Sequence, residues 1–157
     1  YQVNGKIHHY TGSSHTEEGH ITKDPSIIAD LNERLREKIE SRVDELSLVK
    51  SDLDDGADTL ILSYGISARS MEAAVNQLRA KGKKVSALTV YSLWPIPEKK
   101  ILEYLKDVKR IIIPEMNHGQ YRQEIERLTN GTIELVGVNR VDTFLITPEE
   151  IVEAYHG

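Results

Sequence analysis

The sequence predicts an α/β fold built on a parallel sheet. Short apolar runs alternate with helical patterns from residue 59 to the end of the chain, which is the signature of successive strand–helix units. The runs are apolar throughout rather than alternating, as is typical of strands that are buried on both faces. We expect the strands at residues 59–64, 85–90, 111–113 and 133–138.

A helical pattern follows each of these runs. Its apolar residues recur every three or four positions, so that they form one face of a helix. The first helix is expected to end at Lys81-Gly82 and the third at Asn130-Gly131, because glycine commonly follows a helix. The apolar residues are Met71, Ala74, Val75 and Leu78; then Ile101, Leu102 and Leu105; then Tyr121, Ile125 and Leu128; and last Pro148, Ile151, Val152 and Tyr155.

The chain divides near residue 50. We expect residues 1–50 to form a connecting segment and an amphipathic helical arm, and residues 51–157 to form the α/β domain. Asp24 and Pro25 mark the start of the arm helix, and its apolar residues recur along a narrow stripe over residues 27–48. Such a stripe docks on another surface but cannot form a core alone. That surface belongs either to the same domain or to another subunit.

Composition excludes several classes of function. The 157 residues carry a formal net charge of −5, which argues against a general nucleic-acid binder with a basic face. There is no cysteine, so this chain contains no thiolate nucleophile, disulfide or cysteine-ligated iron–sulfur cluster. No apolar run approaches the roughly 20 residues that span a bilayer. The lack of cysteine fits a reducing, intracellular location, so we expect a cytoplasmic protein. The start at Tyr1 indicates a fragment or a processed product.

Two loops define the predicted functional edge. Residues 65–70 follow the first expected strand and residues 114–120 follow the third. Right-handed crossovers that cover both faces of a sheet require a change of direction. In flavodoxin-like order the second strand lies on one side of the first and the third on the other. The two loops are therefore predicted to lie side by side, at a crevice outside the carboxyl ends of the strands.

The first loop leads into a helix whose first turn contains an arginine, Arg69, at a position that favours acidic residues. Gly65 permits a tight turn, and Ser67 is well placed to cap the following helix. Arg69 then lies in the first helical turn, where the helix dipole favours acids. Arg69 either binds a partner carboxylate or phosphate, or forms a salt bridge with an acidic neighbour. The loop lacks the three-glycine spacing of a dinucleotide-binding site.

The second loop mixes polar groups that have two interpretations. Glu115 ends the strand, and Asn117, His118, Gly119 and Gln120 follow. Such groups are able to orient a substrate or to stabilise an oxyanion. Alternatively, Asn117 caps a helix that begins near Gly119, which is the interpretation we favour. A lone histidine such as His118 is more often a surface residue than a catalytic base.

The remaining chemistry-bearing residues form no recognised site. Trp94 is the only tryptophan and is either a core residue or an interface anchor. Histidines occur near the N-terminus, but the spacing between His15 and His20 matches no closed zinc site, so we expect no metal. No nucleophile–base–acid triad, P-loop or carboxylate pair is present, so no catalytic residue is assigned.

Several ordered motifs resemble a known family. They are YGISARS at residues 64–70, SLWPIP at 92–97, EMNHGQ at 115–120 and TPEEI at 147–151, preceded by TGSSHTEEGH at 11–20. In this order and spacing the chain resembles the C-terminal domain of the alpha subunit of 2-oxoacid:ferredoxin oxidoreductases, of which the 2-oxoglutarate type is the most similar. It departs from the family at residues 141–144, where glycines are common.

The resemblance implies a fold like the C-terminal domain of transketolase. That fold has three layers, α/β/α, around a mostly parallel five-stranded sheet with one antiparallel edge strand, for which the short alternation over residues 6–10 is a candidate. The family decarboxylates a 2-oxoacid, such as 2-oxoglutarate or pyruvate, to an acyl-CoA and reduces ferredoxin. It uses thiamine diphosphate with Mg, iron–sulfur clusters and coenzyme A.

The resemblance also implies that this chain binds none of these cofactors alone. Thiamine binding belongs largely to the N-terminal alpha domain and the beta subunit, so the chain is expected to be an inert accessory and assembly domain. Arg69, Trp94, Asn117 and Gln120 are expected near its contacts. Two alternatives remain: a module that binds coenzyme A or a phosphorylated effector through Arg69 and a helix N-terminus, and the equivalent domain of another thiamine enzyme.

Overall fold

The chain folds into two compact units. The computed structural model describes residues 2–7, 9 and 11–157, with the backbone alone at residues 2, 3, 6 and 7. The units are Tyr1–Val43 and Asp44–Gly157. The sequence pattern divides the chain near residue 50, and in the structure a strand that starts at Val49 belongs to the sheet of the second unit.

The first unit contains the arm helix. Helix α1 (Pro25–Glu40) starts after Asp24, whose side chain accepts hydrogen bonds from the N–H groups of Ser26 and Ile27. The helix ends at Glu40, before the limit of the apolar pattern. The N–H of Ser41 forms the last i→i−4 bond, to the carbonyl of Glu37, and the N–H of Arg42 bonds instead to the carbonyl of Ile39, three residues back. A one-turn helix, α2 (Val43–Leu46), follows at the boundary between the units.

The second unit contains a mixed five-stranded sheet. Its strand order is β3-β5-β4-β6-β7, in which β3 is antiparallel and the other strands are parallel. This confirms the α/β fold with one antiparallel edge strand. The strands are β3 (Val49–Asp52), β4 (Thr59–Tyr64), β5 (Ser86–Val90), β6 (Arg110–Glu115) and β7 (Glu134–Asn139).

The identity of the antiparallel edge strand corrects the sequence prediction. The edge strand is β3, which pairs with β5 from Val49 opposite Val90 to Asp52 opposite Ala87. Of the candidate residues 6–10, Lys6–Ile7 forms β2, which pairs with β1 (Gln2–Val3) in a separate two-stranded sheet, while residues 8 and 10 lie outside the described residues. Most side chains of β3 are exposed, so this edge strand lacks the apolar run by which buried strands are detected.

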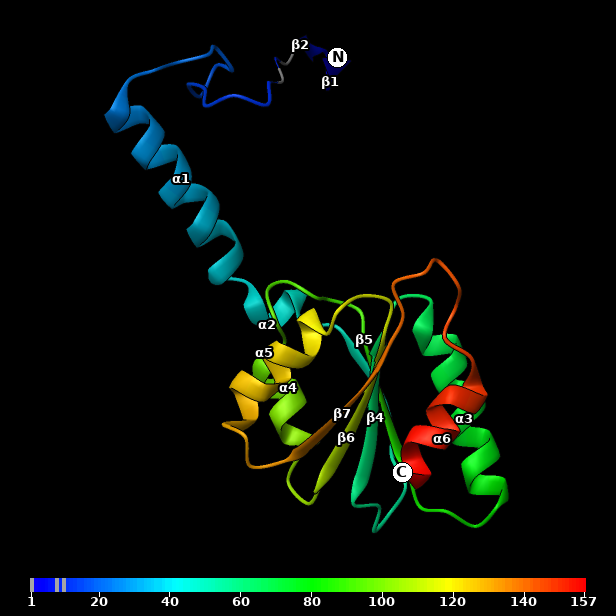
Figure 1. The fold of residues 1–157 in the computed structure, drawn as a ribbon. Coiled ribbons are helices and arrows are strands. Elements are labelled where there is room, and N and C mark those ends of the chain that lie inside the picture. The colour runs from blue at the N-terminus through cyan, green and yellow to red at the C-terminus, as the bar shows by residue number, and fades with distance from the viewer. Residues whose placement is uncertain (1, 8, 10) are drawn as a thin grey trace. The chain divides into compact units, whose positions relative to one another are not determined.

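Helices cover both faces of the sheet, which gives three layers (Figure 1). Helices α3 (Ser67–Ala80) and α6 (Pro148–His156) lie on one face, and α4 (Glu98–Glu103) and α5 (Gln120–Thr129) on the other. Each parallel strand except the last is followed by a helix that returns the chain to the start of the next strand. The connecting loops at the carboxyl ends of the strands therefore share one edge of the sheet.

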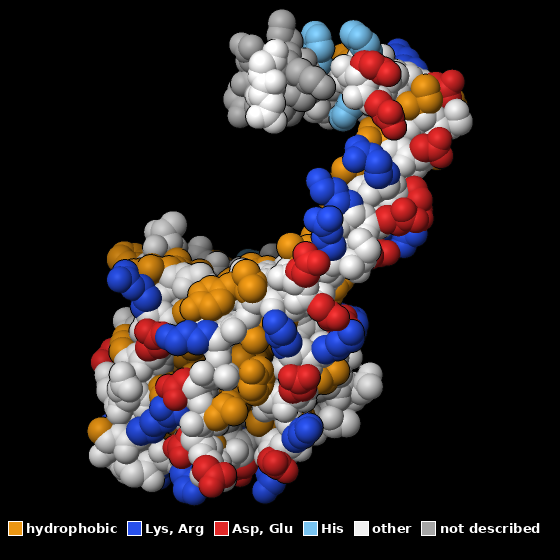
Figure 2. Space-filling model, turned by 180° about the vertical axis from the view of Figure 1, so that it is seen from behind, with side chains coloured by type: hydrophobic (Ala, Val, Ile, Leu, Met, Phe, Trp, Pro, Cys, Tyr) orange, Lys and Arg blue, Asp and Glu red, His pale blue; other side chains and the backbone are white. Residues whose placement is uncertain are grey.

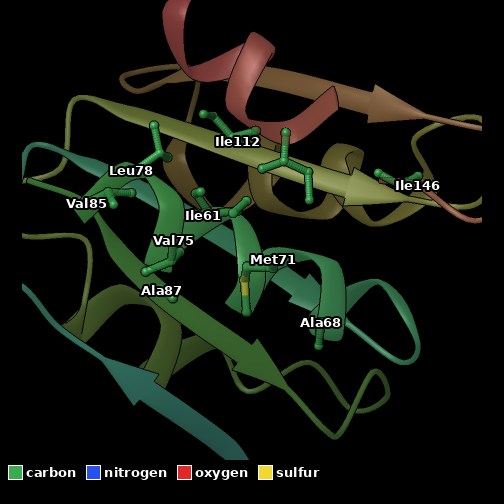
Figure 3. Packing of buried hydrophobic residues seen from close by; sticks show 11 residues of the cluster. Ile61, Ala68, Met71, Val75, Leu78, Val85, Ala87, Ile112 and Ile146 are labelled. Carbon is green, nitrogen blue, oxygen red and sulfur yellow. The ribbon is translucent and has the colours of Figure 1, made fainter. Parts of the chain in front are cut away.

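Apolar residues from both sides of each central strand form the core. Ile61 and Ile112 face α3 and α6, where they pack against Met71, Val75 and Leu78 (Figure 3). The alternate residues of the same strands face α4 and α5 instead; they are Leu60, Leu62, Ile111 and Ile113. Burial on both faces explains why these strands read as continuous apolar runs.

Candidate functional site

The two predicted loops lie at neighbouring strand ends. Strands β4 and β6 are adjacent and parallel, with Leu60 opposite Ile111 and Ile61 opposite Ile112. Strand β5 pairs with the other side of β4. The sheet therefore changes direction between β4 and β6, as flavodoxin-like order requires. The expected juxtaposition of residues 65–70 and 114–120 is confirmed.

A buried polar network joins the two loops. The Tyr64 hydroxyl donates to Oε2 of Glu115 at 3.1 Å and accepts from Nδ2 of Asn117 at 2.7 Å. Glu115 is only 1% exposed, and its carboxylate also accepts from the backbone N–H groups of Tyr121 (3.0 Å) and Arg122 (3.1 Å). The carboxylate therefore occupies the N-terminus of α5, where the helix dipole and free N–H groups favour an anion.

The Asn117 side chain accepts hydrogen bonds from backbone N–H groups at the start of α5. Its side-chain oxygen accepts from the N–H groups of Gly119 (2.7 Å) and Gln120 (3.0 Å), which is the structural role that the sequence favoured. Gly119 has a φ of 95°, and an added Cβ there would lie 3.2 Å from the Arg122 guanidinium; glycine is therefore required at this turn. Gln120 and His118 are exposed at the surface.

Ser67 does not cap α3, which corrects the sequence prediction. The helix begins one residue earlier than expected, with Ile66 as its N-cap, and no side chain caps it. Ser67 is consequently the first helical residue and is buried, so its hydroxyl is not placed to accept from the following N–H groups. Gly65 supplies the tight turn before it, with a φ of 56°.

Arg69 is exposed in the first turn of α3. Among the residues that the structure describes it forms no ion pair or hydrogen bond through its side chain, so the salt bridge to an acidic neighbour is not present there. The first turn of α3 also contains no acidic residue. This helix N-terminus is therefore open to a negatively charged group from outside the unit.

Large apolar side chains are exposed around these loops, and we call them the carboxyl-edge surface. Hydrophobic side chains gather along this end of the Asp44–Gly157 unit in Figure 2. Contiguous exposed apolar patches on proteins mark interaction sites. Trp94 is 73% exposed, which excludes the interpretation of Trp94 as a core residue. The surface consists of Ile66, Tyr91, Leu93, Trp94, Val141, Phe144 and Leu145.

Polar anchors hold the loop that leads from β7 to α6. Arg140 bonds to Asp142 at 2.8 Å and to Glu150 at 3.1 Å, and its guanidinium lies 5.7 Å from the Phe144 ring centre. The hydrogen bonds from Arg140 keep the pKa of Asp142 below its ordinary value. Thr143 has a φ of 71°, a conformation that suits glycine better than threonine. Thr143 lies within residues 141–144, where the resemblance described above leads us to expect glycines.

The loop after β5 is also anchored. The Ser92 hydroxyl accepts from the backbone N–H of Leu48 at 2.7 Å and donates to the carbonyl of Leu46. Pro97 is buried at the far end of the loop. Trp94 therefore projects from a segment whose two ends are fixed on the unit.

Tyr64 provides a test of the network in alkaline solution. Burial and the neighbouring Glu115 carboxylate raise the pKa of Tyr64 to about 12, whereas an unfolded tyrosine has a pKa of about 10. The raised value means that folding favours the neutral phenol, so its contribution to stability is complete below about pH 10 and is lost as the pH rises through about 12. Urea unfolding across this range should show a steeper loss of stability for wild type than for Tyr64→Phe. Parallel profiles would contradict the proposed network.

The structure also locates His9, His15 and His20 near the N-terminus. The rings of His9 and His20 have centres 5.5 Å apart, and Nδ1 of His15 lies 3.0 Å from the carbonyl of Ser13. Within the described part of the chain, no group of three His, Cys, Asp or Glu residues is arranged to hold a metal ion. A search of the same residues finds no helix both long and apolar enough to cross a membrane.

Comparisons with known proteins identify relatives of this chain. The family model described as pyruvate:ferredoxin oxidoreductase core domain II matches residues 57–151. The 2-oxoglutarate synthase subunit KorA of Methanocaldococcus jannaschii is 32% identical over 149 residues, which are 95% of this chain and 40% of that protein. KorA of Methanothermobacter marburgensis is 30% identical over 148 residues, which are 94% of this chain and 40% of that protein. The chain thus spans about two-fifths of these curated relatives.

Solved structures show the same fold. A 2-oxoglutarate:ferredoxin oxidoreductase from Magnetococcus marinus matches with a TM-score of 0.70 at 24% identity, covering 98% of this chain and 27% of that chain. A split gene transketolase, described as an inactive beta4 tetramer, matches with a TM-score of 0.58 at 19% identity. The match covers 68% of this chain and 41% of that chain. The match of the family model over more than half of the chain favours the oxidoreductase over another thiamine enzyme. The chain therefore belongs to the family of pyruvate:ferredoxin oxidoreductase core domain II.

Proposed function

We propose that this chain is an accessory and assembly domain of a thiamine-diphosphate-dependent 2-oxoacid:ferredoxin oxidoreductase. It packs through the carboxyl-edge surface on the rest of the enzyme and is catalytically inert alone. One observation carries the proposal: at this edge the polar groups bond to one another, while the apolar groups are exposed. The partners are the N-terminal part of the alpha subunit and the beta subunit.

The polar network at the edge is used for structure. The Glu115 carboxylate accepts three hydrogen bonds from the chain itself, and both ends of the Asn117 amide are engaged. A catalytic acid or base needs a direct or one-water path to its substrate, and a carboxylate that is 1% exposed lacks one. These residues therefore support an assembly role rather than chemistry.

The whole enzyme is proposed to convert a 2-oxoacid to an acyl-CoA and to reduce ferredoxin in the cytoplasm. Relatives are described as 2-oxoglutarate synthase and ketoisovalerate oxidoreductase subunits, and the Magnetococcus marinus enzyme was solved with 2-oxoglutarate, coenzyme A and succinyl-CoA. The residues here do not fit the redox cofactor, because an iron–sulfur cluster takes cysteine ligands and the chain has none. They do not fit a diphosphate at α5 either, since Glu115 occupies that N-terminus.

A matched pair of leucines tests the assembly role. Leu145 lies on the carboxyl-edge surface and Leu53 near the opposite edge of the sheet, and both are 56% exposed. We expect Leu145→Ala to weaken association with the rest of the enzyme by about tenfold, because truncation of a buried interface residue costs about 1–2 kcal/mol. Leu53→Ala should have little effect. Association is measured by titration of the purified partner subunits, and equal affinities for the two variants would refute this interface.

A second candidate function is the binding of a phosphate-bearing ligand at α3. It is favoured by the exposed side chain of Arg69 and by the uncapped helix N-terminus beside it. Coenzyme A or a phosphorylated effector supplies the required anion. Calorimetry with coenzyme A tests this candidate, with Arg69→Ala as the control; no heat at millimolar ligand would remove it.

A further inference from the structure

Two arginines at the carboxyl edge lack the carboxylate partner that the other arginines of their unit have. The Asp44–Gly157 unit contains six arginines, and four of them pair with an acidic side chain. Arg69 and Arg122 form no side-chain hydrogen bond or ion pair with any residue that the structure describes. Both lie in the first turn of a helix, α3 and α5 respectively, and neither turn contains an acidic residue. The four paired arginines are Arg79, Arg110, Arg127 and Arg140.

The acidic residues that follow on the same helices do not neutralise them. Glu72, three residues after Arg69, pairs instead with Lys50 at 3.1 Å. Glu126 follows Arg122 by four residues, a spacing that permits an ion pair on a helix, but within the described chain the two side chains form none. Each arginine thus carries a positive charge that no carboxylate on its own helix pairs with.

The Arg122 guanidinium is positioned by two glycines. A Cβ added at Gly119 would lie 3.2 Å from its Nη2 atom, and one added at Gly137 would lie 2.7 Å from its Nη1 atom. The side chain therefore turns back toward the N-terminus of α5 and lies against β7, away from Glu126. Glu115 accepts from the backbone N–H of Arg122 and not from its guanidinium. A glycine inside a strand often marks such a close approach, and here the arginine remains partly exposed.

The connections at this edge contain little negative charge. Those after β4, β5, β6 and β7 contain one acidic residue, Asp142, and it bonds to Arg140 at 2.8 Å. Helices α3 and α5 begin at this edge on opposite faces of the sheet (Figure 1), so Arg69 and Arg122 lie on either side of the strand ends. The carboxyl edge therefore combines exposed apolar side chains with two unpaired cations, although the chain as a whole has a net charge of −5.

From these features we infer that the carboxyl-edge surface docks on an acidic protein surface of the rest of the enzyme, in which one carboxylate binds Arg122 and another binds Arg69. A guanidinium binds a carboxylate through two parallel hydrogen bonds, and such charge complementarity adds orientation to an apolar contact. The inference rests on the proposed assembly role.

A phosphate-bearing ligand fits these two arginines less well. A single phosphate contacts only one of two arginines that lie on opposite faces of the sheet. At the start of α5, moreover, Glu115 and Asn117 already accept from the backbone N–H groups that would bind a phosphate. A protein surface is able to supply two separate carboxylates and to cover the apolar side chains at the same time.

Carbodiimide coupling in the complete enzyme identifies the carboxylates. Arg122→Lys and, separately, Arg69→Lys place an amine at each position, and the carbodiimide joins an amine to a carboxylate that contacts it. Arginine is not coupled, so the wild-type enzyme is the control. Mass spectrometry of the digested enzyme should find a new cross-link from each position to an Asp or Glu outside the 157 residues of this chain. A cross-link to an acidic residue of this sequence, or no new cross-link, at either position would overturn the inference.

Removal of the two charges tests their contribution to affinity. Arg69→Gln with Arg122→Gln should weaken association with the purified partner subunits about tenfold and reduce its dependence on salt. The matched control is Lys106→Gln with Lys109→Gln, which removes the same charge from exposed lysines near the opposite edge of the sheet. The control should leave the affinity within about twofold, and equal effects of the two double variants would refute the inference.

Further measurements separate the possible failures. Urea unfolding of the double arginine variant should match that of wild type, so that a loss of affinity is not a loss of folding. If Leu145→Ala weakens association while the arginine variants do not, the carboxylate contacts are wrong and the proposed assembly role remains. If none of these variants has an effect, the proposed function itself is wrong. Heat on addition of coenzyme A that Arg69→Gln abolishes, without a protein cross-link at this position, would assign Arg69 to a phosphate-bearing ligand instead.

Discussion

Replacement of Glu115 by alanine should destabilise the Asp44–Gly157 unit by about 3 kcal/mol. The side chain is buried, and its loss leaves the Tyr64 hydroxyl and the N–H groups of Tyr121 and Arg122 without their acceptor. Each unsatisfied buried donor costs about 1–3 kcal/mol, part of which water entering the cavity recovers. The loss also removes the negative charge at the N-terminus of α5.

Urea unfolding followed by circular dichroism measures this effect. The control is Glu124→Ala within helix α5, since Glu124 is half-exposed and its carboxylate pairs with Arg127 at 3.0 Å. Surface pairs of this kind contribute about 0–1 kcal/mol, so the control should unfold close to the wild-type midpoint. A Glu115→Ala variant as stable as the control would show that the network does not hold the two loops.

Trp94→Ala should have the largest effect on assembly, a loss of about 2–4 kcal/mol in the free energy of association, or roughly 30-fold to 1000-fold in Kd. Tryptophan is enriched among the residues that dominate interface energies. Trp94 is also the most exposed large apolar residue of the carboxyl-edge surface. Its removal should leave the unfolding midpoint of the isolated chain nearly unchanged, because the side chain is mostly outside the core.

Fluorine NMR provides a direct readout of this contact. Trp94 is the only tryptophan, so fluorotryptophan incorporated into this chain gives a single resonance, which should shift and broaden when unlabelled partner subunits are added. Trp94→Phe should retain part of the affinity, since an aromatic ring still fills the contact. An unchanged resonance in the assembled enzyme, or wild-type affinity of Trp94→Ala, would exclude Trp94 from the interface.

The sequence predicts the central strands of the fold better than its edges. Strands β4, β5 and β6 have both faces buried, so their apolar runs are continuous. Strand β3 has no such run: it joins the sheet through its backbone while residues such as Lys50 and Asp52 remain in solvent. Backbone pairing at an edge leaves little trace in side-chain hydrophobicity, which explains why the apolar pattern predicts no strand over residues 49–52.

The sequence likewise predicts only part of the candidate site. Topology alone predicts that the ends of β4 and β6 meet, because crossover handedness restricts the possible strand orders. The direction of a single side chain is not encoded in that pattern. Glu115 turns inward to the start of α5 rather than outward to a ligand, and Ser67 misses its cap because the helix starts one residue early.

The sequence contains a detectable signal for the exposed apolar residues of the loop after β7. Val141, Phe144 and Leu145 occur between a strand and a proline-started helix, in a stretch with no helical or strand period. Large apolar residues in such a connection indicate contact with a partner or with the core. In the structure Ile146 alone turns into the core, while its apolar neighbours remain exposed.

The hydrogen bonds that fix the strand-end loops have a consequence for the entropy of association. Asn117 holds one loop to Tyr64, Ser70 bonds to the carbonyl of Ile146 at 2.6 Å, and Ser92 holds a third loop to residues 46–48. Loops that are ordered before contact lose little conformational freedom when a partner binds, so less of the interaction free energy is spent on ordering them. The carboxyl edge is thus preorganised, which reduces the area of apolar contact that the proposed association requires.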